Sequence, residues 1–377
     1  MTNEVRSDEV YLDWNAATPL HVDVQAAMAE ASQQGWANPA SIHAAGRRAR
    51  ALVEDAREAV ALALALEPSD VVFTSGGTEA NNLALRGAKA LVTSRLEHPS
   101  VVRVAEHLQA AGVPVHWLPV SASGRIEPAD VERELAELPR PVRVAVMAVN
   151  HETGVLQPIA EIARITAAYA AHLHVDAVQA LGRLSPEHYR SGDSFTLASH
   201  KIRGPKGIGA LAFRRGHGPE PLLLGGAQER GLRPGTVDAV AATGFRAALA
   251  RLGQSTEAYL AKAVLRDRFE AALASFAAVN GAGAPRAHHV SNLSFAGLRG
   301  DELVAALDLE HIRISSGSAC SAGTTEPSTV IAAMLGKERA REAIRISLGE
   351  DTSAEQVEYA IGAFVRVLSV AESRALR

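Results

Sequence analysis

Residues 71–82 read VVFTSGGTEANN, a run of β-branched and aromatic residues that meets two glycines and then a helical pattern. The composition of Val71–Thr74 predicts a short buried strand. A strand that turns through glycines into a helix presents free backbone N–H groups and the positive end of the helix dipole. The glycines also let the backbone approach an anion closely. The segment therefore indicates either a phosphate-binding loop, with the Thr78 hydroxyl as a further donor, or a plain helix cap formed by Thr78 and Glu79.

Strands and helices alternate on both sides of this segment. Further strands are expected at 91–94, 113–120, 142–149, 173–176, 195–199 and 209–213, and amphipathic helices at 47–66, 100–111, 128–138 and 159–171. Short β-rich runs separated by helices predict an α/β fold, a mostly parallel sheet sandwiched by helices. In such folds ligands bind beyond the carboxyl ends of the strands.

The rest of the chain predicts a second, smaller unit. A long helical stretch near 237–276 leads into expected strands at 289–295 and 312–315 and expected helices at 301–309 and 354–371. A chain of 377 residues is long for one domain. We expect a large α/β domain at 16–254 and a small α+β domain at 255–377, with residues 1–15 packing on the latter.

Composition excludes several classes of function. The net charge of -4 gives no electrostatic reason to expect nucleic acid or anionic lipid as a partner. No run of 18 apolar residues is present and the N-terminus lacks a signal-peptide core, so we expect a cytoplasmic protein. One cysteine excludes a disulfide framework and a cysteine-rich metal site. The histidines match no zinc-protease pattern, and no metal site is expected.

Two charged residues follow predicted strand ends. Asp176 ends the strand at 173–176, and Lys201 follows the strand at 195–199. A lysine can bond covalently to an aldehyde cofactor, and an aspartate can hold a protonated pyridine nitrogen, which makes the ring an electron sink. Taken singly, each is more often a surface lysine or a helix-capping aspartate. On chemistry alone, Lys206 competes with Lys201.

Several motifs occur together in a fixed order. They are the glycine loop at 75–82, NHETG at 150–154, HVDAVQ at 174–179, SHK at 199–201 and GPKG at 204–207, flanked by YLD at 11–13, NPASIH at 38–43 and RISLG at 345–349. This combination resembles the class V aminotransferase-like family of fold-type I pyridoxal-phosphate enzymes. Within that family the chain resembles the cysteine desulfurases of the nitrogen-fixation and housekeeping iron–sulfur group, over nearly its whole length.

The resemblance implies roles around the ring of pyridoxal 5'-phosphate. Lys201, which directly follows a histidine, would carry the cofactor, and Asp176 would pair with its pyridine nitrogen. Gln179 would bond the ring hydroxyl. His98, in EHP at 97–99, would stack on the ring and shuttle protons, although a lone histidine at a helix start is usually a cap.

It also implies how the phosphate and the substrate are bound. The phosphate would be held by Gly77, Thr78, Ser199 and His200. Ser199 is included because Ala198 stands where the family commonly has a serine. Thr236, in RPGT at 233–236, would reach the phosphate from a second subunit, which implies a homodimer. Asn150 would lie near the ring and the substrate, and Arg345 would bind the substrate carboxylate as a bidentate fork.

The only cysteine, Cys320, lies in ISSGSACSAGTTEPS at 314–328, among small residues with glycines on both sides. A free cysteine is ordinarily a small buried hydrophobe, which fits an apolar strand and not this segment. A mobile loop suits a nucleophile that must reach a bound substrate and then deliver its product. No lysine or arginine lies within five residues of Cys320, so activation of the thiol must come from spatial neighbours. The segment resembles the longer active-site loop of the housekeeping group.

The activity implied is that of a cysteine desulfurase, a sulfurtransferase that converts L-cysteine to L-alanine and stores the sulfur on Cys320 as a persulfide. An acceptor protein, either an iron–sulfur scaffold or a thiolation factor, would then take the sulfur. His151 stands where the family has a second asparagine, and the chain ends soon after its last helix, without the tail that docks a scaffold. The alternatives are a selenocysteine lyase, another class V lyase or aminotransferase, and a docking subunit without enzymatic activity.

Overall fold

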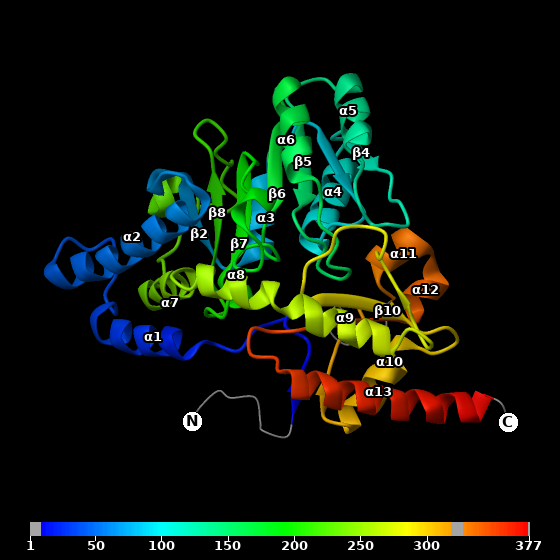
Figure 1. Ribbon diagram of the computed structural model, residues 1–377. Coiled ribbons are helices and arrows are strands. Elements are labelled where there is room, and N and C mark those ends of the chain that lie inside the picture. Colours follow the sequence, from blue (N-terminus) through cyan, green and yellow to red (C-terminus); the bar gives the residue numbers. More distant parts are fainter. Residues whose placement is uncertain (1–8, 318–326, 376–377) are drawn as a thin grey trace.

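A seven-stranded sheet forms the centre of the computed structural model, which describes residues 9–317 and 327–375 (Figure 1). Its strand order is β2-β8-β7-β6-β5-β3-β4. The strands are β2 (Val71–Thr74), β3 (Leu91–Ser94), β4 (Val115–Leu118), β5 (Arg143–Met147), β6 (His172–Asp176), β7 (Ser194–Ala198) and β8 (Gly209–Phe213). All neighbours pair in parallel except β8, which is antiparallel to β2 and β7. The predicted mostly parallel sheet is confirmed.

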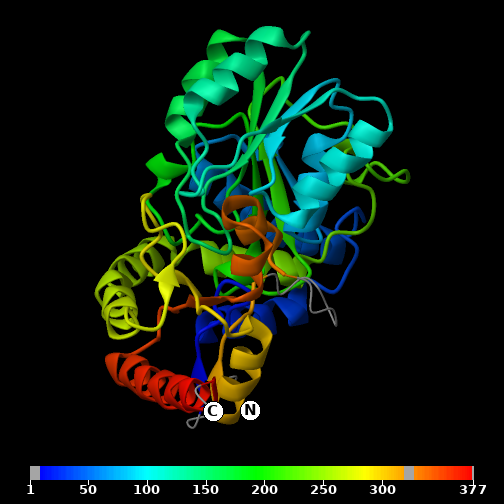
Figure 2. The same ribbon diagram turned by 90° about the vertical axis from the view of Figure 1, so that its right-hand side faces the viewer.

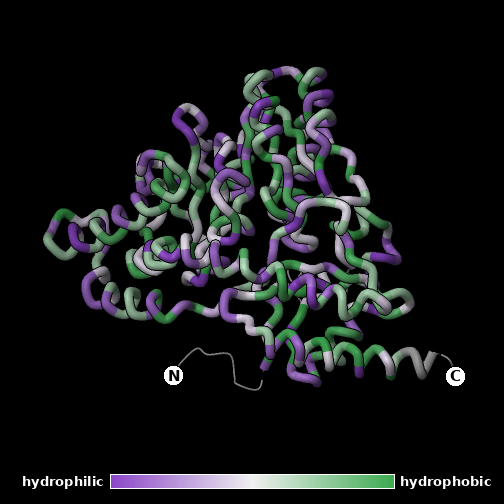
Figure 3. The backbone as a smooth tube through the Cα atoms, in the orientation of Figure 1, coloured by the Kyte–Doolittle hydropathy of each residue, from purple (hydrophilic) through white to green (hydrophobic). Residues whose placement is uncertain are grey.

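Helices cover both faces of this sheet, as the edge-on view shows (Figure 2). One face packs against α3 (Gly77–Leu85) and α4 (Pro99–Ala110). The other face packs against four helices: α2 (Ala44–Leu64), α5 (Pro128–Glu137), α6 (Ile159–Ala168) and α7 (Ala239–Leu249). Successive strand residues serve opposite faces, so Val144 and Val146 join the second layer and Ala145 joins the first. Hydrophobic and hydrophilic residues accordingly alternate along the flanking helices (Figure 3).

The helical stretch expected near 237–276 is divided into three helices. They are α7, α8 (Leu252–Leu260) and α9 (Lys262–Ala272). The chain bends at Arg251, between α7 and α8, where the guanidinium group contacts Asp23 and Glu350 at 3.4 Å each. Asp23 belongs to α1 (Val22–Gln34), which also packs along α7. The bend therefore lies where three segments that are distant in sequence meet.

A second group of strands lies below the large sheet in Figure 1. The antiparallel sheet β12-β10-β9 consists of β12 (Ala343–Ser347), β10 (Val290–Ser294) and β9 (Ala278–Val279). Two more strands, β1 (Val10–Tyr11) and β11 (Ile312–Arg313), pair in parallel. The helices of this region are α10 (Gly300–Leu309), α11 (Thr329–Leu335), α12 (Lys337–Arg341) and α13 (Ala354–Ala375).

This region has a hydrophobic core of its own. Phe269, Phe295 and Phe364 meet there, and the Phe269 and Phe364 rings cross edge to face with centroids 5.2 Å apart. Val10 and Leu12 are buried in the same core, so the N-terminal strand belongs to it. Among the described residues, no helix is long and apolar enough to cross a membrane.

Candidate active site

A cavity of about 360 Å³ lies at the carboxyl ends of β5, β6 and β7. This is the edge of a parallel sheet at which ligands are expected. It brings together many of the predicted site residues: Gly77, Thr78, His98, Asp176, Gln179, His200, Lys201 and Arg345. It also includes residues that were not predicted, among them Asn15 and Ala16 from the N-terminal segment and Asn81 from α3. Among the described residues, no cluster of three or more histidine, cysteine or acidic side chains could hold a metal.

Asp176 ends β6 with its carboxylate buried at the cavity wall. One carboxylate oxygen accepts the Val178 N–H at 3.0 Å, and the other accepts the side-chain amide of Asn81 at 2.8 Å. Both donors are neutral, although a buried carboxylate is best stabilised by a positive partner. A protonated pyridine nitrogen in the cavity meets that requirement, so this wall fits pyridoxal phosphate.

Lys201 closes a single 3₁₀ turn (Ser199–Lys201) that directly follows β7. Its Nζ donates to the backbone carbonyls of Asn15 at 2.6 Å and Ala16 at 2.7 Å, which hold the amine at the cavity. Lys206, the competing lysine, is exposed and does not line the cavity. Position therefore separates two lysines that chemistry alone left equivalent.

His98 is both a helix cap and a cavity residue. It is the N-cap of α4, where Nδ1 accepts the Ser100 N–H at 3.2 Å and lies 2.8 Å from the Ser100 hydroxyl. Because Nδ1 accepts, the neutral ring carries its proton on Nε2. Burial lowers the pKa of His98, and nearby Lys201 lowers it further while Asp176 opposes the shift. Capping thus fixes the ring at the cavity wall in one tautomer.

The glycine loop presents the start of α3 to the cavity. Thr78 lines the cavity, while Glu79 turns back to accept the Ser75 N–H at 2.7 Å. The sequence left two roles open for Thr78 and Glu79, phosphate binding and helix capping. Thr78 lies where it could bind a phosphate, whereas Glu79 bonds the backbone of its own loop. A Cβ on Gly77 would lie 3.0 Å from Val178, and a Cβ on Gly209 only 2.7 Å from the Cα of Gly76. The loop backbone therefore packs against β8 so closely that residue 209 must be glycine, and Gly77 leaves little room for a side chain beside Val178.

Ser199 does not reach the cavity. Ala198, the last residue of β7, faces the cavity, whereas Ser199, the first residue of the following 3₁₀ turn, does not line it. Ser199 is fully buried against Gly204, where an added Cβ would lie 2.0 Å from the Ser199 hydroxyl. The hydroxyl that we expected to replace a serine at 198 is thus turned away from the cavity. His200 does line the cavity, and burial lowers its pKa to about 4.

Asn150 shapes a turn and does not line the cavity. Its Oδ1 accepts the N–H groups of Glu152 at 3.0 Å and Thr153 at 2.9 Å, and its Nδ2 donates to the Leu96 carbonyl at 2.9 Å. The adjacent His151 lines the cavity in its place. The His151 ring meets the His98 ring edge to face at 5.4 Å, and burial lowers the pKa of His151 well below its usual value.

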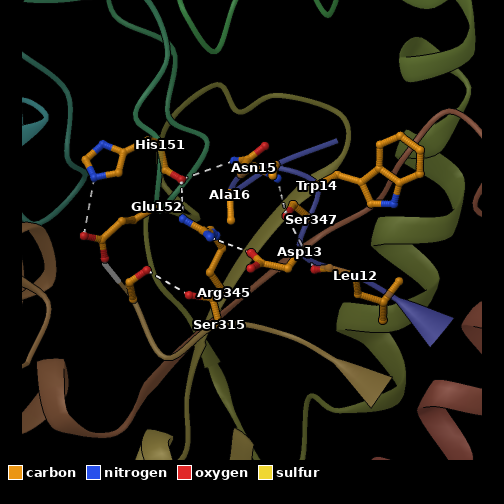
Figure 4. A network of polar contacts seen from close by, with 12 residues as sticks. Leu12, Asp13, Trp14, Asn15, Ala16, His151, Glu152, Ser315, Arg345 and Ser347 are labelled. Atoms are coloured by element: carbon orange, nitrogen blue, oxygen red, sulfur yellow. Dashed lines mark hydrogen bonds and ion pairs between the residues drawn. The ribbon is translucent and has the colours of Figure 1, made fainter. Parts of the chain in front are cut away.

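Arg345 lies on β12 and reaches the cavity from the second core (Figure 4). Its guanidinium group is 2.6 Å from the Asp13 carboxylate and donates to the His151 carbonyl at 3.2 Å. Its backbone also bridges to Ser315 through two hydrogen bonds. Arg345 thus joins the N-terminal segment, the 150–154 turn and the segment that leads to residue 317.

Cys320 lies outside the described residues, but both flanks of its segment are described. Gly317 and Ser328 lie side by side, since a Cβ on Gly317 would be 3.1 Å from the Ser328 Cβ. The Ser328 hydroxyl donates to the buried Glu152 carboxylate at 2.5 Å, next to His151. The chain therefore leaves and returns at one point beside the cavity.

Thr236 is described, is exposed and does not line the cavity of its own chain.

Comparisons with known proteins agree with this arrangement. Residues 10–360 match the Aminotransferase class-V family. The chain is 34% identical to "Cysteine desulfurase IscS" of Dictyoglomus turgidum, over 96% of this chain and 94% of that protein. It is 38% identical to "IscS-like cysteine desulfurase" of Mycobacterium tuberculosis, over 97% of each.

Solved structures point to the same family. A NifS-like protein from Rickettsia africae superposes with a TM-score of 0.87 at 30% identity, covering 95% of this chain and 99% of that chain. A structure titled "SspA in complex with cysteine" gives a TM-score of 0.78 at 30% identity, covering 91% and 99%. From the sequence match and the shared fold, we conclude that this chain belongs to the class-V aminotransferase family.

Proposed function

We propose that this chain is a cysteine desulfurase that converts L-cysteine to L-alanine and transfers the sulfur first to Cys320 and then to an acceptor. The observation that carries the proposal is the meeting of Lys201, Asp176, His98 and Arg345 in one cavity beside the flanks of the Cys320 segment. Curated relatives named cysteine desulfurase, at 34–38% identity over nearly the whole chain, support the same reading.

The cofactor of this family is pyridoxal 5'-phosphate, which supplies an aldehyde and an electron-accepting ring. Lys201 would bond to the aldehyde and Asp176 would hold the ring nitrogen. Gln179 would bond the ring hydroxyl, and its amide is oriented by a hydrogen bond to the Asn15 carbonyl at 3.0 Å. His98 would lie against the ring and move a proton through Nε2, since its Nδ1 is engaged by the cap.

The phosphate would be held by Gly77, Thr78 and His200, together with Thr236 from a second copy of the chain. Support for a homodimer comes from the surface beside the cavity. A larger hollow of about 730 Å³ adjoins it, shares Thr78 and His98 with it and is lined by Leu222. The next two residues, Leu223 and Leu224, are exposed. Exposed leucines beside a shared hollow are typical of a surface that another subunit covers.

Arg345 would bind the substrate carboxylate. Its Nε has no hydrogen-bond partner within the described part of the chain, so the guanidinium group retains an unused donor. A carboxylate placed there would share the guanidinium group with Asp13, which holds Arg345 in place beforehand. Asn150 would act indirectly, because its bonds to the 150–154 turn place His151 at the cavity.

The thiolate of Cys320 would attack the substrate sulfur as the carbon–sulfur bond breaks, and the carbon fragment would take up a proton and leave as alanine. We place this chemistry in the cytoplasm, where a single free thiol stays reduced. The acceptor would be an iron–sulfur scaffold or a thiolation factor.

We also propose that the large and small domains divide near residue 254, within α8, with residues 10–15 on the small one.

Mass spectrometry after one turnover with L-cysteine tests the function. The wild-type protein should gain one sulfur atom on the peptide that contains residues 316–328, and the persulfide should persist because the chain has no second cysteine to resolve it. Cys320→Ala should still bind the cofactor and L-cysteine but form no alanine. Ser321→Ala, a matched change in the same segment, should retain activity. Sustained alanine formation by Cys320→Ala at the wild-type rate without added thiol would refute the proposal.

The same protein distinguishes the alternatives. A selenocysteine lyase would release alanine from selenocysteine and not from cysteine, and a transaminase would form no alanine from cysteine. A docking subunit without activity would show no visible absorbance from a bound cofactor.

A further inference from the structure

A chain of polar side chains runs along one face of the large sheet, away from the cavity. Asp176, His174 and His172 occupy alternate positions of β6 and therefore point to the same face. Leu173 and Val175 point to the other face and join the main hydrophobic core. The next strand, β7, adds Ser194 opposite His174. The sequence HLHVD at 172–176 thus places a buried polar row beneath the carboxylate that faces the cavity.

Each member of this row touches the next. The Asn81 side chain is 2.8 Å from the Asp176 carboxylate, and His174 Nε2 is 3.0 Å from Asn81 Oδ1. Ser194 Oγ lies 2.8 Å from His174 Nδ1 and 2.7 Å from His172 Nε2. The Nδ1 atoms of His172 and His217 are 2.8 Å apart, and His217 lies at the partly exposed end.

Every bond in the row has only one permitted direction. The Asp176 carboxylate accepts from the Asn81 amide, so Asn81 turns its oxygen toward His174 and accepts from Nε2–H. A neutral imidazole protonated on Nε2 accepts on Nδ1, so the Ser194 hydroxyl must donate to His174. Ser194 then accepts from His172 Nε2–H, and His172 Nδ1 accepts from His217. All the donors therefore point toward Asp176.

The two inner histidines stay neutral over the working pH range. Burial, together with the nearby Arg143, lowers the pKa of His174 to about 3. Burial, together with His174, His217 and Arg143, lowers the pKa of His172 to about 2. The groups that face Asp176 itself are His98, Lys201 and Glu97. Burial raises the pKa of Glu97 well above its usual value, which favours the neutral form of this neighbour of Asp176.

Asn81 also joins this row to His98. Its amide donates to the Ser100 hydroxyl at 2.9 Å as well as to Asp176, and Ser100 in turn donates to His98 Nδ1. Both N–H bonds of the amide and its oxygen are therefore used, on three different partners. An amide does not relay protons, so the row orients Asp176 and His98 and does not conduct protons to them.

We propose that Asn81, backed by this row, is a positioning residue that holds Asp176 as an anion against the ring nitrogen of the cofactor. The inference rests on the proposed function, because it assigns a role toward the cofactor proposed there. Hydrogen bonds whose donors all point toward a buried carboxylate stabilise the charged form of that carboxylate. That charge in turn keeps the ring nitrogen protonated, which is the condition for the ring to accept electrons.

The test is a pH titration of the visible absorbance of the bound cofactor, which reports the pKa of its covalent linkage to Lys201. A positive charge on the ring nitrogen disfavours a second one on that linkage, so loss of the row should raise the linkage pKa. We expect Asn81→Leu and His174→Leu to raise it by about one unit and to weaken cofactor retention about tenfold. His174→Gln, which can still donate and accept, should restore most of the wild-type value.

Thr93→Val is the matched control, since Thr93 is a buried residue of the same sheet whose hydroxyl donates to the Ala145 carbonyl outside the row. It should lower the melting temperature without moving the linkage pKa. If Asn81→Leu and His174→Leu behave like Thr93→Val, the row is purely structural and the proposal is overturned. Should either leucine variant fail to fold, Ser194→Ala gives the same comparison with a smaller change. The titration needs only bound cofactor, so it can fail or succeed independently of alanine formation, which tests the proposed function.

Discussion

Replacing Glu229 with alanine is expected to cost about 4 kcal/mol of unfolding free energy and to loosen the segment that carries Thr236. The Glu229 carboxylate is buried and accepts two bonds from the Arg57 guanidinium group at 2.7 Å each. It also accepts the backbone N–H of Phe73, in β2, at 2.7 Å. This one side chain therefore fastens the turn before residues 233–236 to the strand that leads into the glycine loop.

The magnitude follows from what each broken bond leaves behind. Removing one partner of a buried ion pair costs about 3–5 kcal/mol. A cost of about 3 kcal/mol, the lower limit of this range, is expected here because Arg57 would still bond Glu54 at 3.0 Å and the Val71 carbonyl at 2.8 Å. The unpaired Phe73 N–H adds about 1 kcal/mol. Glu54→Ala is the matched control, since it removes the half-exposed partner of the same arginine and should cost less than about 1 kcal/mol.

Urea unfolding followed by tryptophan fluorescence measures both variants, and cofactor retention at equilibrium reports on the loosened segment. The reasoning would be refuted if Glu229→Ala and Glu54→Ala unfolded at the same urea concentration. If Glu229→Ala lost stability but still retained the cofactor, the buried ion pair would stabilise the fold without positioning residues 233–236.

Three further outcomes are expected. Lys201→Ala should lose the borohydride-trappable cofactor bond and Lys206→Ala should keep it, and peptide mapping that finds the adduct on Lys206 would reverse the assignment. Thr236→Ala should weaken cofactor retention in a dimer, and sedimentation of a fully loaded, active monomer would contradict the shared site. His174 should make the fold sensitive to acid. Because its folded pKa, about 3, lies below the unfolded value near 6.5, its contribution is complete above pH 6.5 and falls by about 1.4 kcal/mol for each pH unit below it. His174→Gln should flatten that dependence in urea unfolding at pH 7 and pH 5, and an unchanged slope would argue against it.

The elements that frame the site were predictable because their signals are local. The expected strand at 71–74 has the bounds of β2, since β-branched residues and a glycine pair delimit it. Asp176 was expected at a strand end and lies there, at the edge of the sheet where the other strand-end residues converge. Because the carboxyl ends of parallel strands lie at one edge of the sheet, side chains at those ends are expected to lie close together.

Other features of the site depend on contacts that no local pattern encodes. Whether Ser199 or Ala198 faces the cavity depends on the residue at which β7 ends and the 3₁₀ turn begins, a boundary that the sequence does not locate to one residue. The carbonyls of Asn15 and Ala16, which bind Lys201, come from the far end of the chain. The role of Asn81 could have been sought from the sequence of β6. The alternation of HLHVD at 172–176 places polar side chains on one buried face, and these side chains need a polar partner such as Asn81.

The path of the N-terminal segment has a consequence for synthesis on the ribosome. Asn15 donates its backbone N–H to the Ser347 hydroxyl, 332 residues further along, and β1 pairs with β11. The large sheet can form while the chain is still emerging, because its strands lie between residues 71 and 213. The contacts of the N-terminal segment with β11 and β12 cannot form until those strands have been made, whereas its bonds to Gln179 and Arg183 can form earlier. An incomplete nascent chain is therefore expected to hold the carbonyls that bind its reactive lysine less firmly, and tight cofactor retention is expected only after β12 has been made.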